Sequence, residues 1–123
     1  MIDYSGKRIA LIDDNIINLK VAKKKLLPYN IIVDEGENMA KLFELLKINE
    51  YDLLLLDDMM EVMSGTEAMQ KLKSEGYLKP IVVITGNDDP GYKQKYLEAG
   101  FDEYLAKPIN EEELDRVLKL FLG

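Results

Sequence analysis

The sequence of 123 residues contains neither cysteine nor histidine. Without cysteine the chain can form no disulfide framework and no thiolate metal site. Without histidine it can build no imidazole-ligated metal centre, no histidine-based catalytic triad and no phosphohistidine of its own. Any divalent metal that the chain binds must therefore be held by oxygen ligands.

Long apolar runs and an excess of positive charge are also missing. The leucine run 53–56 is far shorter than the about 20 residues that a membrane-spanning helix needs. The first six residues are polar and show no signal peptide, so we expect the chain in the cytoplasm, or on the cytoplasmic side of a larger protein. The net charge of −7 argues against direct binding to nucleic acid or to an anionic membrane surface.

The length and the 47% share of hydrophobic residues are those of one globular domain, which we expect over residues 1–123. The chain is organised around the stretch 51–58, in which four consecutive leucines precede Asp57 and Asp58. A strand that is apolar along its length, rather than alternating, is covered by helices on both faces. This stretch is therefore expected to be the central strand of a parallel sheet.

Strand and helix patterns alternate five times along the chain. Asn15, Asn38 and Asn110 stand where helices should begin, and Pro28 and Gly100 where helices should end. The alternation predicts an α/β fold, with a doubly wound parallel sheet between two layers of helices. The expected strands are 9–12, 30–33, 51–58, 80–85 and 101–106, and the expected helices start near 16, 39, 66, 90 and 111.

Five polar residues lie at or just past the carboxyl ends of these strands: Asp13, Asp14, Asp57, Thr85 and Lys107. Because those ends share one edge of a doubly wound sheet, the five side chains should converge. Three carboxylates in one cleft repel one another unless a cation lies among them, and Mg²⁺ suits oxygen ligands. With Lys107 and Thr85 beside it, such a site suits a phosphoryl group and an aspartate nucleophile. The spacing leaves open whether phosphate is transferred or merely bound.

The same residues carry a family resemblance. Over essentially its whole length the sequence resembles the response regulator receiver domains of two-component signalling. This resemblance implies a flavodoxin-like fold with strand order 2-1-3-4-5, and a phosphoacceptor domain with at most self-phosphorylation and self-dephosphorylation activity. The motifs that carry it are Asp13-Asp14-Asn15, Asp57, Met60 with Met63-Ser64-Gly65, Thr85, and Tyr104-Leu-Ala-Lys107-Pro108.

The resemblance also implies roles for single residues. Asp57 would accept a phosphoryl group from a phosphohistidine on a histidine kinase or a histidine phosphotransfer protein. Asp14, Asp57 and the backbone carbonyl of Met59 would ligate Mg²⁺ directly, and Asp13 would do so through water. Lys107 would contact the phosphoryl group.

Further implied features concern the response to phosphorylation. Thr85 would rotate toward the phosphoryl group and Tyr104 would move inward, a change read by an output partner or an adjoining domain. A cis bond typically precedes Pro108 in the family. Met59 and Asn87 would lie near the water that removes the phosphoryl group, and because Met59 offers that water no good hydrogen bond, we expect slow loss.

A narrower resemblance is to receivers attached to hybrid sensor histidine kinases. It rests on Asp13-Asp14-Asn15-Ile-Ile-Asn18, Asp57-Asp58-Met-Met and Ser64-Gly65-Thr66. The chain is therefore expected to be a module of a longer polypeptide, with a free-standing regulator as the alternative.

Two neighbouring aspartates compete for the role of acceptor. The family places a glycine eight residues after the acceptor, and Gly65 has that spacing from Asp57. Neighbours in a pleated strand point to opposite sides, so Asp58 should face elsewhere. We therefore choose Asp57. Asp58 then stands where an apolar residue is common, and Glu61 replaces the usual proline.

Other interpretations remain open at this stage. A magnesium-dependent phosphatase of the haloacid dehalogenase kind needs a second aspartate where this chain has Met59. A flavodoxin needs a Ser/Thr/Gly-rich loop where this chain has Asp13-Asp14-Asn15. Tyr92 and Tyr96 either share an exposed face of their helix or pack beneath it. The loop methionines also have two interpretations: Met59, Met60 and Met63 either form a docking surface for a partner or fill gaps in the packing.

Overall fold

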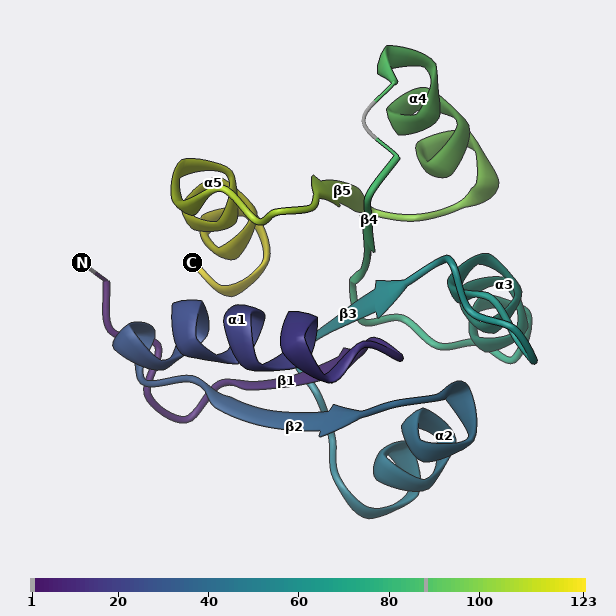
Figure 1. Cartoon of the computed structure of the whole chain (residues 1–123). Coiled ribbons are helices and arrows are strands. Elements are labelled where there is room, and N and C mark those ends of the chain that lie inside the picture. Colours follow the sequence, from purple (N-terminus) through teal and green to yellow (C-terminus); the bar gives the residue numbers. More distant parts are fainter. Residues whose placement is uncertain (1, 88) are drawn as a thin grey trace.

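A computed structural model of the chain describes residues 2–87 and 89–123, so Met1 and Asp88 lie outside the described residues. The five strands form one parallel sheet in the order β2-β1-β3-β4-β5, which confirms the predicted flavodoxin-like topology (Figure 1). The strands are β1 (Arg8–Ile12), β2 (Ile32–Gly36), β3 (Leu53–Asp57), β4 (Ile81–Thr85) and β5 (Glu103–Ala106). The helices are α1 (Ile16–Leu26), α2 (Met39–Ile48), α3 (Gly65–Ser74), α4 (Pro90–Ala99) and α5 (Glu111–Leu122), with a short 3₁₀ helix η1 (Leu27–Tyr29).

The sheet separates two hydrophobic cores. Leu53 and Leu55 of β3 pack with side chains of α1 and α5, whereas Leu54 and Leu56 pack with side chains of α2, α3 and α4. All four leucines have 0% of their surface exposed. Since a fully buried leucine contributes about 1.5–3 kcal/mol, this strand alone anchors both layers of helices. Among the described residues, no helix combines the length and the apolar character that crossing a membrane requires.

Side-chain caps determine where most helices begin. The carboxamide oxygens of Asn15, Asn38 and Asn110 each accept backbone N–H bonds from the first turn of the helix that follows. Ser64 and Glu67 form a reciprocal capping box at the start of α3. Each cap satisfies donors that a helix leaves unpaired and is worth about 1 kcal/mol. The predicted starts of these helices are confirmed.

Three strands differ from the prediction by two residues or more, and the strand expected over 51–58 is observed as Leu53–Asp57. The second strand was expected at 30–33 but runs from Ile32 to Gly36, because Asn30 adopts a left-handed conformation (φ 61°) that ends η1. Polar Asp34 and Glu35 lie within this edge strand, and Asp34 is paired with Arg8 of β1 at 2.7 Å. The fifth strand begins at Glu103 rather than 101. Just before it, the side chain of Asp102 accepts the backbone N–H of Ile81 at the start of β4.

The loop after β3 folds back tightly onto the strand end at Gly65. A Cβ atom at this position would lie 2.6 Å from the backbone carbonyl oxygen of Asp57. That obstacle is backbone, so it cannot turn aside as a flexible side chain would. Glycine therefore lets the first residue of α3 approach the strand end on which Asp57 stands.

Gly65→Ala should lower the free energy of unfolding by about 1–3 kcal/mol, the usual cost of forcing an extra carbon into a packed site. Gly91→Ala is the matched control, because a Cβ at Gly91 in α4 meets nothing within 4 Å. Alanine there should be neutral or stabilise the protein by up to about 1 kcal/mol. Urea unfolding of the two variants measures the difference, and equal stabilities would contradict the tight approach at Gly65.

Candidate functional site

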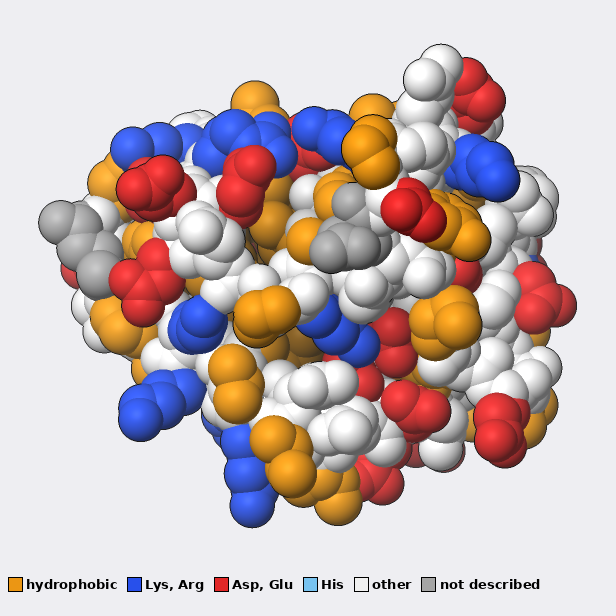
Figure 2. Space-filling view, turned by 45° about the horizontal axis from the view of Figure 1, so that its top comes forward, with side chains coloured by type: hydrophobic (Ala, Val, Ile, Leu, Met, Phe, Trp, Pro, Cys, Tyr) orange, Lys and Arg blue, Asp and Glu red, His pale blue; other side chains and the backbone are white. Residues whose placement is uncertain are grey.

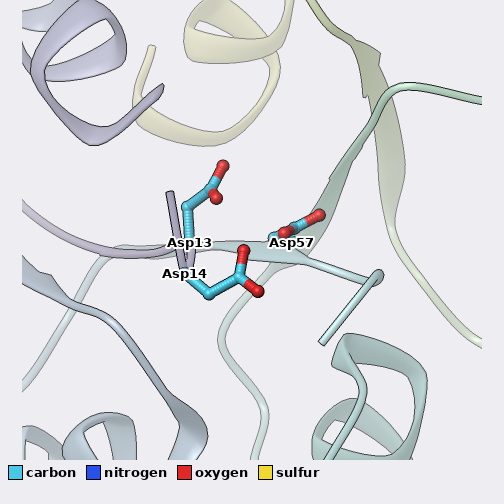
Figure 3. Close-up of side chains that lie close together, drawn as sticks. All are labelled: Asp13, Asp14 and Asp57. Atoms are coloured by element: carbon cyan, nitrogen blue, oxygen red, sulfur yellow. The ribbon is translucent and has the colours of Figure 1, made fainter. Parts of the chain in front are cut away.

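Three carboxylates meet at the carboxyl edge of the sheet. Asp13 and Asp14 follow β1 and Asp57 ends β3, and one oxygen from each lies within 4.8 Å of the others. Figure 3 shows the three side chains gathered around one spot between the ends of these strands. Asp13 and Asp57 are buried, whereas Asp14 is exposed and closes the cluster from the solvent side. The predicted convergence of the three aspartates is therefore confirmed.

Lys107 supplies the positive charge at this cluster. Its Nζ atom lies 2.7 Å from Oδ2 of Asp13 and 3.2 Å from Oδ1 of Asp57. It follows β5, and its backbone N–H donates to the carbonyl oxygen of Thr85 at 2.8 Å. Burial acts to lower the pKa of Lys107, but the two carboxylates outweigh it and the pKa is raised. Lys107 therefore stays an ammonium at neutral pH.

Asp57 has a different electrostatic balance. Burial raises its pKa to about 6, Lys107 opposes that rise and the charge of Asp13 adds to it. The carboxylate also accepts the backbone N–H of Met59 at 3.3 Å. At pH 7 most of the Asp57 carboxyl groups are still ionised. Burial of that charge is unfavourable, and a nearby cation would stabilise the ionised form.

The donor set fits a hard divalent cation. Every side-chain ligand in the cluster is a carboxylate oxygen, the donor type that Mg²⁺ prefers. The protein as a whole is acidic, with a net charge of −7, which favours the approach of cations. In Figure 2, Asp and Glu side chains are frequent on the right, whereas most Lys and Arg side chains lie to the left and along the top.

The two predicted switch residues both contact Asn87 in the loop between β4 and α4. Thr85 is fully buried at the end of β4, and its hydroxyl oxygen accepts the backbone N–H of Asn87 at 3.2 Å. Tyr104 in β5 is half-buried, and its hydroxyl donates to the backbone carbonyl of Asn87. Both side chains therefore hold the same β4–α4 loop. The Lys107–Pro108 peptide bond is cis, as the resemblance implied.

Asp58 points away from the cluster, as expected from the pleat. Its Oδ1 accepts bonds from the backbone N–H and the hydroxyl of Thr66, at 2.9 and 2.7 Å. Its Oδ2 accepts the hydroxyl of Tyr96 at 2.9 Å. Sequence reasoning missed this contact. The available signal was an acidic residue at a position that is usually apolar, together with a tyrosine on the inner face of the fourth helix.

The structure decides part of the two interpretations that the sequence left open. Tyr96 is buried, so the packing alternative holds for it. Met60 and Met63 pack against the core and fill gaps, whereas Met59 is 64% exposed. The sulfur of Met59 lies 3.9 Å from Nδ2 of Asn87, so the two residues expected near the attacking water are in contact.

The chain is similar to known proteins over most of its length. The family model described as "Response regulator receiver domain" matches residues 9–119. The two-component response regulator ORR41 of Oryza sativa subsp. japonica is 32% identical over 93% of this chain and 93% of its own length. The hybrid signal transduction histidine kinase M of Dictyostelium discoideum is 34% identical over 90% of this chain but only 5% of its own length.

The chain is also similar to a solved structure of a receiver domain. The receiver domain of sensor histidine kinase PA1611 from Pseudomonas aeruginosa PAO1 is 29% identical, with a TM-score of 0.84 over 97% of this chain and 99% of that chain. Its structure holds a magnesium ion coordinated in the active site cleft. The chain spans less than a fifth of the length of several curated relatives that it matches. It is thus similar both to a regulator of its own size and to one part of much longer proteins.

Asp57→Asn should stabilise the metal-free protein at pH 7. The folded-state pKa of Asp57 is about 6, above its ordinary value of 3.8, so the carboxyl group favours folding at low pH and loses that contribution as the pH rises through 6. The stability gained by Asp57→Asn should therefore grow between pH 4 and pH 7. One pKa unit is worth about 1.4 kcal/mol, so the gain stays below about 3 kcal/mol.

Urea unfolding in EDTA, repeated at several pH values, measures this gain. Glu44→Gln is the control, because Glu44 is a surface carboxylate with 68% of its side chain exposed. A gain at Asp57 that did not change with pH would show that burial of the charge is not its cause.

Proposed function

The chain belongs to the response regulator receiver domain family, and on that premise we propose that Asp57 is its phosphoacceptor. The supporting observation is the placement of one buried carboxylate beside an ammonium group and two further carboxylates. The chain is a signalling module, and its phosphoryl donor would be a phosphohistidine on a histidine kinase or a histidine phosphotransfer protein. A single receiver domain over residues 1–123 is part of the same proposal.

The transfer needs a nucleophile and compensation of phosphoryl charge. An Oδ atom of Asp57 attacks phosphorus, a P–O bond forms, and the P–N bond to the donor imidazole breaks with its electron pair going to the ring nitrogen. Because Asp57 is mostly ionised at pH 7, no base has to remove a proton from it first. The ammonium of Lys107, 3.2 Å from Asp57, is placed to bind a phosphoryl oxygen.

A magnesium ion fits this proposal. Asp14, Asp57 and the backbone carbonyl of Met59 would hold it directly and Asp13 through water, and the bound ion would neutralise the phosphoryl oxygens. Similarity to PA1611, whose receiver domain has magnesium in its cleft, supports the assignment. The Asp13 carboxylate is already paired with the ammonium of Lys107 and accepts the backbone N–H of Asn15 at 2.9 Å. Both of its oxygens thus have partners, which suits binding to the ion through water.

The response would pass through the β4–α4 loop. The backbone N–H of Asn87 donates to the Thr85 hydroxyl, and the backbone carbonyl of Asn87 accepts from the Tyr104 hydroxyl. Movement of the Thr85 hydroxyl toward a phosphoryl group would therefore release Asn87 and change the acceptor that Tyr104 binds. An output partner or an adjoining domain would read that change. The phosphatase alternative gains no support, since exposed Met59 occupies the position where the general acid would stand.

Incubation with acetyl phosphate and Mg²⁺ should phosphorylate the protein on Asp57. The label, followed by intact-protein mass spectrometry or phosphate-affinity gels, should disappear in Asp57→Asn and in EDTA. Asp58→Asn should still become labelled, because Asp58 faces Thr66 and Tyr96 rather than the carboxylate cluster. Label retained in Asp57→Asn but lost in Asp58→Asn would move the acceptor by one residue.

The phosphoryl group should be lost more slowly from the wild type than from Met59→Asn. A thioether cannot orient the attacking water by a good hydrogen bond, whereas an amide can. Met59→Leu is the matched control, since it keeps an apolar side chain of similar volume and should keep the wild-type lifetime. Decay is measured after removal of acetyl phosphate, and identical half-lives for the asparagine variant and the wild type would refute the role of residue 59.

A further inference from the structure

Methionine is the side chain of this protein that peroxides oxidise most readily. The sequence has six methionines but neither cysteine nor tryptophan, so no thiol or indole competes for an oxidant. Among the residues that the structure describes, Met59 is the most exposed methionine at 64%, whereas Met39 and Met69 are 3% and 0% exposed. Met60 and Met63 are partly buried against the core. Of these five sulfur atoms, that of Met59 is the one most open to a small oxidant in solution.

Met59 stands between the proposed acceptor and the loop that follows β4. Its backbone N–H donates to Oδ1 of Asp57 at 3.3 Å, and its sulfur lies 3.9 Å from Nδ2 of Asn87. The backbone of Asn87 in turn binds the hydroxyl groups of Thr85 and Tyr104. A chemical change at the Met59 sulfur therefore takes place two residues from the acceptor and in contact with the loop that carries the predicted switch.

Oxidation would change which hydrogen bonds the Met59 side chain can make. A thioether sulfur is a weak acceptor, whereas a sulfoxide is polar and its oxygen accepts hydrogen bonds much as an amide oxygen does. That oxygen can accept a bond from the amide of Asn87 and still offer a lone pair to a water molecule beside Asp57. The side chain would thus gain the acceptor that the thioether lacks for orienting the attacking water.

We propose that Met59 is a peroxide-sensitive modification site, and that its oxidation to the sulfoxide shortens the lifetime of the phosphoryl group on Asp57. The oxidant is a hydroperoxide such as hydrogen peroxide. The sulfur attacks one peroxide oxygen and forms an S–O bond, while the O–O bond breaks with its electron pair going to the other oxygen. A proton from the first oxygen then completes a water molecule, or an alcohol where the peroxide is organic. Two electrons pass from sulfur to the peroxide.

Limited treatment of the unphosphorylated protein with hydrogen peroxide, followed by desalting and peptide mass spectrometry, tests the site. This part of the inference does not depend on the proposed function. Met59 should gain one oxygen atom before the four less exposed methionines, which are Met39, Met60, Met63 and Met69. Oxidation of any of these four before Met59 would overturn the assignment.

The lifetime of the phosphoryl group tests the consequence, which does rest on the proposed function. The oxidised protein is phosphorylated with acetyl phosphate and Mg²⁺, acetyl phosphate is removed, and the loss of label is followed. Loss should be roughly two- to tenfold faster than from untreated protein, the range that one hydrogen bond of ordinary strength supports. Treatment with both methionine sulfoxide reductases, one for each sulfoxide epimer, should restore the slower rate.

Three variants assign the effect to one sulfur atom. Met59→Leu has no thioether and should lose the label at the same rate with and without peroxide treatment. Met59→Gln carries a permanent acceptor oxygen, so it should lose the label about as fast as the oxidised wild type and show no response to peroxide. Met63→Leu is the matched control, because it removes a packed methionine from the same loop and should keep the response.

The outcomes separate this inference from the function on which its consequence rests. A wild-type protein that acetyl phosphate does not label would remove the proposed function and the effect on lifetime, while mass spectrometry would still decide whether Met59 is the oxidised site. A labelled wild type whose rate of loss does not change when Met59 is oxidised would overturn the inference alone. A peroxide response that persists in Met59→Leu would also overturn it, since another side chain would then be responsible.

Discussion

The ammonium group of Lys107 lies between the buried carboxylates of Asp13 and Asp57, and the rest of the site is arranged around that contact. Burial and the charge of Asp13 both push the carboxyl group of Asp57 toward protonation and raise its pKa, and the lysine opposes them. The contact exists only because β1, β3 and β5 are parallel and end at one edge of the sheet. The neutralisation is partial, because one lysine faces three carboxylates, and this leaves excess negative charge that a divalent cation can compensate.

Two adjacent side chains at the carboxyl end of β3 face different surroundings because the chain is pleated there. Asp57 faces the carboxylate cluster, while Asp58 faces the helices and holds Thr66 and Tyr96. An apolar residue at position 58 would pack in the same layer without a directional bond. The carboxylate instead links the strand end to α3 and α4, so a change at Asp57 has a short route to the helices through its immediate neighbour.

Much of the fold and of the site could be predicted from residues with a strong local preference. Leucines 53–56 indicate a strand buried on both faces, and the asparagines before α1, α2 and α5 mark where those helices begin. The bounds of β2 were missed because its residues are polar on an edge strand, where neither burial nor alternation is strong. The Asp58–Tyr96 bond was missed because its partners are 38 residues apart and neither has a short-range signal for the other.

The order of strands and helices, the absence of histidine and cysteine chemistry, and the acidic residues at the strand ends can all be read from the sequence. Those features depend on local periodicity and on side-chain type, which are written along the chain. Three contacts follow from the packing of the folded chain instead: Lys107 bridges Asp13 and Asp57, Asp58 binds Tyr96, and Gly65 approaches the backbone of Asp57. These contacts join segments that packing brings together, and their geometry depends on distances of a few tenths of an ångström that no sequence pattern encodes.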